Sequence, residues 1–362
     1  MYRQLEEHLK KWKNDPFRLP LLFRGARQVG KSYLAETFGR EHFESFVSVN
    51  FEANPEYCAC FETLDPQEII SKMELISGQL IVPGKTLLFL DEIQNCPRAI
   101  TAIRYFKEKM PLLHVIGAGS LLEFAFQKGE YSFPVGRVEP VYVRPLSFQE
   151  YLIANNALQL PKALEQASLA SPLSKAIHEH FSKLVRQYFL IGGMPAPISI
   201  FLKTQSFLKA QEMQAIILEV YQSDFSKYAK ERDHKFLRVL FEKIPLFIGQ
   251  HFKPAKLHPE AKTADLRKAF TSLAKAGIVL PVYATSGAGI PLKTHQKENS
   301  LKALFLDIGL IQQVHQVDKE KIWTEDLTLL NAGALAEQFV GQELLALGEI
   351  YQTKDLFFWE RE

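Results

Sequence analysis

The chain has 362 residues, of which 47% are hydrophobic and 23% charged, and its formal net charge is +2. These values are ordinary for a globular protein of two or three domains, and they exclude a global electrostatic attraction to nucleic acid or anionic lipid. The three cysteines show no CxxC pairing, which indicates neither a disulfide framework nor a zinc site and favours a reduced, cytoplasmic compartment. No apolar stretch is long enough to predict a membrane span, and the charged N-terminus does not resemble a signal peptide.

Apolar runs of strand length alternate with helical patterns up to about residue 145. We predict strands within 19–25, 46–52, 86–92, 111–120 and 138–147, and a helix over 32–40 after the first of them. Strands that alternate with helices indicate βαβ units and a parallel sheet. This part of the chain is therefore expected to have an α/β fold.

The pattern becomes mostly helical after residue 145, with a break at "GGMP" (192–195). Residues 262–292 predict two helices, a strand, a glycine turn and a second strand, an order that suits a winged-helix unit. An amphipathic helix over 332–348 then precedes an aromatic, strand-like run at the end of the chain.

Residues 25–32, "GARQVGKS", match the phosphate-loop pattern G-x-x-x-x-G-K-[ST] at every fixed position. The glycines let successive N–H groups converge on phosphate oxygens, and the following helix adds its positive N-terminal end. Lys31 is predicted to reach the β and γ phosphates, and the Ser32 hydroxyl to ligate Mg²⁺. The predicted nucleotide-binding residues are Gly25, Ala26, Arg27, Gln28, Val29, Gly30, Lys31, Ser32 and Tyr33. The alternative is a plain strand–turn–helix with a surface lysine.

Two acids, Asp91 and Glu92, end the apolar run "LLFLDE". An acid at the end of a buried strand binds Mg²⁺ in P-loop enzymes, and an adjacent glutamate can polarise the attacking water. The alternative is a pair of solvated acids after a core strand. Together with the loop, the pair predicts binding of ATP or GTP with Mg²⁺, and hydrolysis with Glu92 as general base.

Four further polar residues have a functional and a structural interpretation each. Ser120 ends the next strand, where it could contact the γ-phosphate or could cap a turn. Asn50 ends the second strand, where it could restrain the catalytic glutamate or form a strand-end turn. Arg137 is a candidate arginine finger, donated in cis or by a neighbouring subunit, or else a structural arginine. Arg27 is expected to be structural or to face a partner.

The motifs "GARQVGKS", "LFLDEIQ", "HVIGAGSLL", "SFPVGRVE", "YFLIGGMPAPI", "LFLDIGLI" and "GALAEQFVGQEL" follow one another in this order. Together they closely resemble the large prokaryotic family of AAA-type P-loop ATPases joined to a C-terminal domain of unknown function. The resemblance implies a parallel-sheet P-loop NTPase core (AAA+/ASCE, STAND-like) over 1–150 and a helical lid or linker over 151–230. It also implies a winged-helix-like segment over 231–295 and a partial α+β domain over 296–362 that resembles PD-(D/E)xK nucleases.

By this resemblance, Glu337 matches the acid of the first helix in the nuclease-like domain. The chain departs from the family at its end, because it stops at Glu362 before the metal-binding acids that usually follow. We therefore expect no nuclease activity from this chain, and the alternative for Glu337 is an ordinary exposed helix acid.

The function favoured by these motifs is Mg²⁺-dependent ATP hydrolysis coupled to a conformational change on a macromolecular partner, with DNA and a second copy of the chain as candidates. One alternative is an ATP-regulated switch that binds nucleic acid with little turnover. Its basis is a local excess of basic residues, comprising Lys253, Lys256, Lys262, Arg267, Lys268 and Lys275. A solvated helix face would explain the same residues. The other alternative is a scaffold with an inactive nucleotide site.

Overall fold

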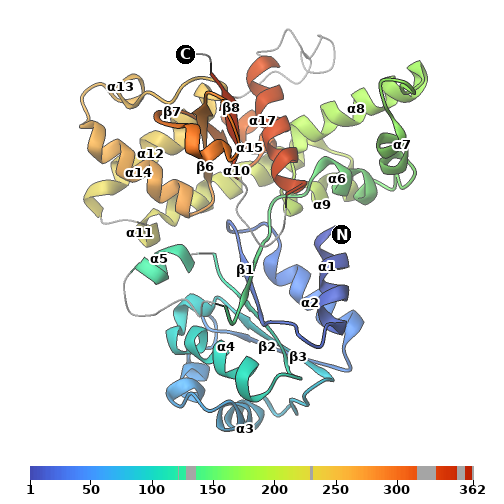
Figure 1. The fold of residues 1–362 in the computed structure, drawn as a ribbon, viewed down its shortest axis with the longest axis vertical. Helices are drawn as coiled ribbons and strands as arrows, with labels where there is room; N and C mark the ends of the chain where they lie inside the picture. Colours follow the sequence, from blue (N-terminus) through green and yellow to red (C-terminus); the bar gives the residue numbers. More distant parts are fainter. Residues whose placement is uncertain (121, 128–135, 229–230, 316–331, 349–354, 361–362) are drawn as a thin grey trace. The chain divides into compact units, whose positions relative to one another are not determined.

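The computed structural model describes residues 1–120, 122–127, 136–228, 231–315, 332–348 and 355–360. The chain divides into two compact units (Figure 1). The N-terminal unit holds Arg3–Arg144, and the C-terminal unit holds Pro145–Gly348 together with the described end of the chain. Within the described residues, no helix combines the length and apolar composition needed to cross a membrane.

The N-terminal unit is built on a parallel sheet of five strands in the order β2-β3-β4-β1-β5. The strands are β1 (Leu21–Arg24), β2 (Ser45–Asn50), β3 (Thr86–Asp91), β4 (His114–Ala118) and β5 (Glu139–Tyr142). All five lie where the sequence predicted them. Because β4 lies between β1 and β3, the residues that follow β4 lie between the loop after β1 and the acids that end β3.

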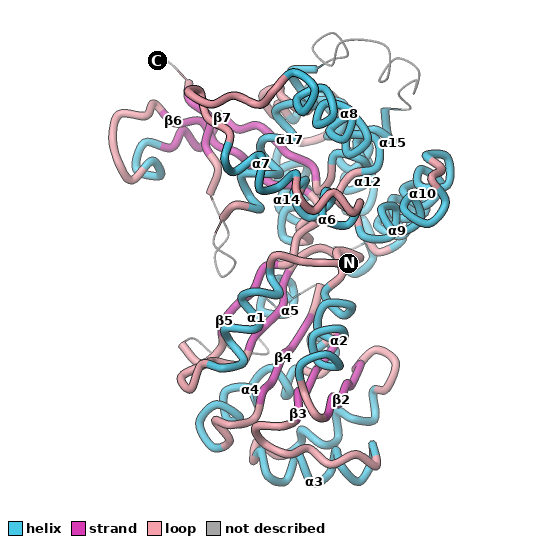
Figure 2. Tube along the Cα trace, turned by 90° about the vertical axis from the view of Figure 1, so that its right-hand side faces the viewer, coloured by secondary structure: helices cyan, strands magenta, loops and turns pink. Residues whose placement is uncertain are grey.

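Helices cover this sheet, as the burial of its strands requires (Figure 2). Strands β3 and β4 are buried at every position, which is typical of parallel strands covered on both faces. The helices of this unit are α1 (Leu5–Asn14), α2 (Lys31–His42), η1 (Pro55–Glu62), α3 (Pro66–Ser77), η2 (Ile93–Asn95), α4 (Pro97–Lys109) and α5 (Leu122–Gln127). Phe61, Ile70 and Ile103 from η1, α3 and α4 share one apolar core with the inner strands.

The C-terminal unit is mostly helical, as predicted. Its first helices are α6 (Phe148–Ala154), α7 (Leu160–Gln166), α8 (Lys175–Ile191), α9 (Pro195–Thr204), α10 (Phe207–Ser223) and α11 (Phe225–Tyr228). They are followed by η3 (Glu231–Asp233), α12 (His234–Lys243), η4 (Ile244–Phe247), α13 (Pro254–Leu257), α14 (Thr263–Lys275), η5 (Leu292–His295), α15 (Ile308–His315) and α17 (Ala332–Ala346).

A small three-stranded sheet completes this unit in the order β7-β6-β8. Strands β6 (Val279–Thr285) and β7 (Gln296–Phe305) pair antiparallel, and β8 (Phe357–Trp359) pairs parallel with β6. The terminal aromatic run therefore forms the strand that was predicted.

The prediction of two helices within 262–292 is wrong, because that stretch contains only one α-helix, α14, before β6. The apolar residues Leu266, Ala269, Phe270 and Leu273 are all buried and recur at helical spacing without a break. One continuous apolar stripe therefore supports one helix.

Candidate nucleotide site

The loop between β1 and α2 has the backbone conformation that its glycines allow. Gly25 and Gly30 have φ angles of 130° and 94°, which L-residues with a side chain rarely adopt. A Cβ atom on Gly25 would also lie 2.1 Å from the carbonyl oxygen of Val143. Ala26 and Val29 are buried and anchor the loop in the core. The loop therefore has a fixed form, and it leads directly into the N-terminus of a twelve-residue helix that favours anions.

Two other predicted loop residues lie nearer to solvent. Gln28 is exposed and has a positive φ of 61°. Tyr33 is 55% exposed on the first turn of α2. Neither side chain belongs to the buried part of the site, so any contact that they make with a nucleotide would come from its solvent side.

Lys31 begins α2, and its side chain is buried against the loop rather than exposed, contrary to the surface-lysine alternative. Its Nζ donates hydrogen bonds to the carbonyl oxygens of Gly25 at 3.0 Å and Ala26 at 2.7 Å. Burial lowers the pKa of Lys31 to about 8, although the carboxylates of Glu92 and Asp91 act in the opposite direction. The ammonium group thus lies in the loop, next to two acids.

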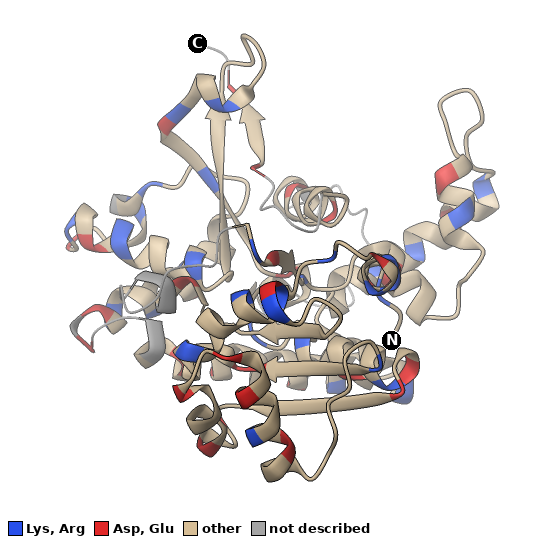
Figure 3. Ribbon diagram, turned by 60° about the horizontal axis from the view of Figure 1, so that its bottom comes forward, with Lys and Arg blue, Asp and Glu red and all other residues tan. Residues whose placement is uncertain are grey.

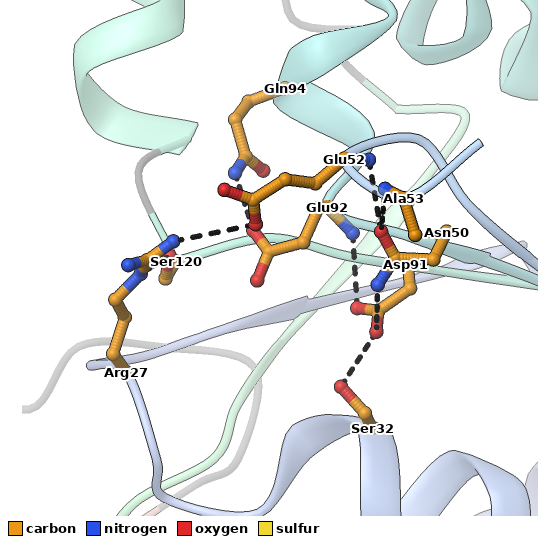
Figure 4. Close-up of polar contacts among 9 residues, drawn as sticks. All are labelled: Arg27, Ser32, Asn50, Glu52, Ala53, Asp91, Glu92, Gln94 and Ser120. Carbon is orange, nitrogen blue, oxygen red and sulfur yellow. Dashed lines mark hydrogen bonds and ion pairs between the residues drawn. The ribbon is translucent and has the colours of Figure 1, made fainter. Parts of the chain in front are cut away.

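Asp91 brings the end of β3 to the start of α2. The Ser32 hydroxyl donates to Asp91 Oδ2 at 2.8 Å, and the backbone N–H of Glu92 donates to Asp91 Oδ1 at 3.0 Å (Figure 4). Burial raises the pKa of Asp91, and these two hydrogen bonds oppose the rise. A hydroxyl and a buried carboxylate that meet in this way form the oxygen donor set that Mg²⁺ prefers. The residues present therefore fit the cation that the loop motif implies.

Asn50 contacts Asp91, whereas its functional interpretation required a contact with Glu92. Its Nδ2 donates to Asp91 Oδ2 at 3.4 Å. Its Oδ1 accepts from the backbone N–H groups of Glu52 at 2.9 Å and Ala53 at 3.0 Å. This is an Asx turn after β2, so the geometry agrees with the strand-end interpretation and not with a restraint on Glu92.

Glu92 is held by a residue that the sequence analysis missed. Its backbone has φ 47° and ψ 43°, a left-handed conformation that is uncommon for glutamate. Gln94 Nε2, from the short turn η2, donates to Glu92 Oε2 at 2.5 Å (Figure 4). The only sequence signal for this contact is the glutamine two positions after the acid pair in "LFLDEIQ".

Ser120 and Arg27 meet at the end of β4. Arg27 Nε donates to the Ser120 Oγ at 3.3 Å, and Arg27 Nη2 lies 3.7 Å from Glu52 Oε2 (Figure 4). Ser120 is 7% exposed. The loop arginine thus joins the segment after β4 to the segment after β2, and the structure brings Ser120 to the predicted site.

Arg137 does not join this cluster. It precedes β5, at the edge of the sheet where the parallel strands begin, whereas the loop lies where β1 ends. Its Nε donates to Glu108 Oε1 at 3.0 Å, in the last turn of α4. Within the N-terminal unit, the described partner of Arg137 is therefore Glu108 and not a residue of the loop.

Glu337 makes a close ion pair in the C-terminal unit. Lys302 Nζ donates to both carboxylate oxygens of Glu337, at 2.9 Å and 3.0 Å. The same ammonium lies 5.0 Å from the ring centroid of Phe358. Both carboxylate oxygens of Glu337 accept hydrogen bonds from Lys302, so Glu337 is part of an ion pair between α17 and β7.

Comparison with known protein families agrees with the geometry of this site. An AAA domain matches residues 18–152, so the N-terminal part of the chain is an AAA domain of the P-loop ATPase class. A domain of unknown function, DUF8612, matches residues 182–321. The chain therefore joins an AAA ATPase domain to a C-terminal domain of unknown function, as the sequence motifs indicated. No curated protein matches the sequence.

One solved structure supports the fold. The Walker-type ATPase PABY2304 of Pyrococcus abyssi is similar with a TM-score of 0.52 and 15% identity, over 87% of this chain and 95% of that one. The ORC2 protein of Aeropyrum pernix, solved in ADPNP–ADP complexes, is similar with a TM-score of 0.43 and 13% identity, over 89% and 96%. At 15% identity the first similarity supports the fold alone, and the second, with a TM-score below 0.5, carries no argument.

Proposed function

We propose that this protein binds ATP with Mg²⁺ and hydrolyses it, and that hydrolysis drives a conformational change acting on a macromolecular partner. The observation that carries the proposal is the 2.8 Å contact between the Ser32 hydroxyl and Asp91. This contact joins a hydroxyl oxygen and a carboxylate oxygen at the start of the helix that follows the phosphate loop, which supports a Mg²⁺ site there. A turn without function would have no need of a buried carboxylate there.

The residues of the site have distinct roles in this reaction. The N–H groups of the loop would bind the phosphates, and Lys31 would leave the carbonyls of Gly25 and Ala26 to neutralise the β and γ phosphates. Ser32 and Asp91 would hold Mg²⁺, which supplies charge neutralisation on the phosphate oxygens.

Glu92 would act as the general base. Its carboxylate accepts a proton from water while the water oxygen attacks the γ-phosphorus. The bond between the γ-phosphorus and the β–γ bridging oxygen breaks, and the products are ADP and inorganic phosphate. Ser120, whose hydroxyl accepts a hydrogen bond from Arg27, would orient the γ-phosphate.

The test measures ATP affinity and phosphate release for the full chain and four variants. Lys31→Ala should lose ATP binding, whereas Lys72→Ala, at an exposed position on α3, should not. Glu92→Gln should bind ATP and release phosphate about a thousandfold more slowly, whereas Glu41→Gln, an exposed acid of α2, should match the parent. A Glu92→Gln variant that hydrolyses ATP at the parent rate would refute the assignment.

A second candidate function is an ATP-regulated switch that binds nucleic acid. The order α12, α13, α14, β6, β7 supports the proposal of a winged-helix-like segment, and α14 leaves Arg267 and Lys268 exposed. Two observations weaken this candidate. Lys268 Nζ already pairs with Asp233 Oδ2 at 2.6 Å. Lysines and arginines are also interspersed with acids over the ribbon (Figure 3).

Duplex DNA binding separates the two candidates. If the protein is such a switch, its affinity for DNA should fall steeply as the salt concentration rises. Arg267→Ala should weaken DNA binding, whereas Lys72→Ala should not. No retardation of DNA at low salt would remove it. The third candidate, a scaffold with an inactive nucleotide site, requires that neither ATP binding nor phosphate release be detected in the parent.

Two further proposals concern the setting of the protein. Arg137 lies 50% exposed beyond its pair with Glu108, so a role as a finger would have to act on the site of a second copy. Nucleotide-dependent oligomerisation, measured by sedimentation with and without ATP, tests that idea. The three cysteines are free, which supports a reduced cytoplasmic compartment.

A further inference from the structure

Gln94 occupies a position that neither the loop motif nor the acid pair explains. It lies in η2, the single turn that follows Glu92, and its neighbour Ile93 is fully buried. Its amide nitrogen donates to Glu92 Oε2 at 2.5 Å (Figure 4). The amide is thus fixed at one end on the carboxylate that would activate water.

The other end of the same amide packs against the loop after β4. A Cβ atom on Gly119 would lie 2.3 Å from Gln94 Oε1, so the glutamine fills the space that a larger residue at position 119 would need. Gly119 is itself held, because its N–H donates to the carbonyl oxygen of Phe23 in β1 at 3.2 Å. Gln94 therefore has little room to swing away from Glu92.

Gln94 Oε1 is buried and has no hydrogen-bond partner within the part of the chain that the structure describes. A buried acceptor without a donor is unfavourable, and a glutamine that served packing alone would be replaced by an apolar residue of the same shape without loss. The amide is then required for its nitrogen, which donates the hydrogen bond to Glu92.

We propose that Gln94 is a positioning residue for the general base, and this inference rests on the proposed ATP hydrolysis. A glutamate side chain has several rotamers, and a base is effective only when it is held in reach of the water that it deprotonates. Gln94 fixes Oε2, while the hydrogen bond from the Glu92 N–H to Asp91 fixes the backbone. The other carboxylate oxygen of Glu92, Oε1, would then accept the proton from water.

The test compares steady-state ATP hydrolysis by the full chain with that of Gln94→Met, which keeps the length of the side chain and removes the donor. We expect kcat to fall about ten- to a hundredfold while KM for ATP and the thermal stabilisation by ATP stay unchanged. Gly119→Ala should give the same result, because the added methyl displaces the amide. Gly333→Ala, where a Cβ atom meets nothing within 4 Å, should match the parent.

A double-mutant cycle separates positioning from a merely structural role. Gln94→Met should lower kcat no further in a Glu92→Gln background, because the group that it positions is gone. An equal loss in both backgrounds, an unchanged kcat, or a kcat that rises when the amide is removed would each overturn the proposal. An unchanged kcat in Gln94→Met together with a large loss in Glu92→Gln would overturn positioning and leave the proposed function intact. Parent-rate hydrolysis by Glu92→Gln would overturn both.

Discussion

Acidification to pH 5 should destabilise the N-terminal unit through His114, the first residue of β4. This imidazole is 4% exposed and lies edge-on to the rings of Trp12 and Phe43, with centroids 5.4 Å and 4.8 Å away. Its Nε2 lies 3.0 Å from the carbonyl oxygen of Lys13 and therefore carries the proton of the neutral ring. Its Nδ1 is buried without a partner among the described residues, so a second proton would find no acceptor there.

The size of the effect follows from the pKa of this group in the two states. Burial, with the positive charges of Arg18 and Lys13 acting in the same direction, lowers the pKa of His114 from 6.5 to about 4. Between these values the unfolded chain binds a proton that the native chain does not, so stability is lost as pH falls below 6.5. The linkage relation predicts that the free energy of unfolding falls by about 2 kcal/mol between pH 7 and pH 5.

Urea unfolding at the two pH values, with the parent compared to His114→Gln, measures this loss. The glutamine amide can still donate to the Lys13 carbonyl but does not titrate in this range. Trp12 fluorescence reports on the N-terminal unit when Trp323 and Trp359 are replaced by phenylalanine. Titration of other groups is common to both proteins and cancels in the difference. The parent should lose about 2 kcal/mol more than the variant on acidification, and equal losses would refute the reasoning.

Three further outcomes follow from backbone geometry and burial. Gly192→Ala should lower the free energy of unfolding several times more than Gly78→Ala does. The two glycines have similar φ angles, 73° and 67°. A Cβ atom at Gly192 would lie 2.0 Å from an oxygen of Asp307, whereas a Cβ atom at Gly78 would meet nothing within 4 Å. Urea denaturation measures both, and equal costs of about 1–2 kcal/mol would contradict the clash. Gly25→Ala should abolish ATP binding in an equilibrium assay, with Gly78→Ala as the control that retains it. Burial raises the pKa of Glu343 to about 7, so its contribution to stability is present below pH 4.5 and lost as pH rises through 7. Glu343→Gln should therefore lose less stability than the parent between pH 5 and pH 8, and an identical pH dependence would contradict this.

The strands and the loop could be predicted because their signals are local. "LLFLDE" combines a buried strand with the acids at its end, and the loop motif fixes residue types within eight positions. The contact of Gln94 could not be predicted, since it depends on the left-handed backbone at Glu92 and on the loop after β4. The choice between two meanings of Asn50 likewise needed the register of β2 with β3.

The same limit applies to residues whose partners are distant in sequence. Arg137 lies 29 positions from Glu108, and Lys302 lies 35 positions from Glu337, so neither pair has a recognisable spacing. A strand order that inserts β4 between β1 and β3 is also a long-range property. Sequence motifs thus predicted that the loop and the acid pair meet, while the position of Arg137 and the contact of Gln94 depend on the fold.

The motifs of the C-terminal unit meet in one buried polar cluster. Asp307 accepts from the backbone N–H groups of Gly193 at 2.5 Å and Gly309 at 3.0 Å. Gln342 Nε2 donates to the Tyr188 hydroxyl at 2.7 Å. The motifs "GGMP", "LFLDIGL" and "GQEL" therefore contribute to one buried hydrogen-bonded cluster. Burial raises the pKa of Asp307 in this cluster to about 6.

One residue of this cluster also holds the segment that follows β5. The Tyr188 hydroxyl donates to the Leu146 carbonyl oxygen at 2.5 Å, which ties Leu146 to the C-terminal unit. Three residues earlier, the Val143 N–H donates to Arg24 at 2.8 Å, and the Val143 carbonyl leaves room only for a glycine at position 25. A change in the loop on nucleotide binding would thus act on a segment that is anchored in the C-terminal unit within a few residues. The proposed coupling of hydrolysis to the C-terminal unit would use this short covalent connection.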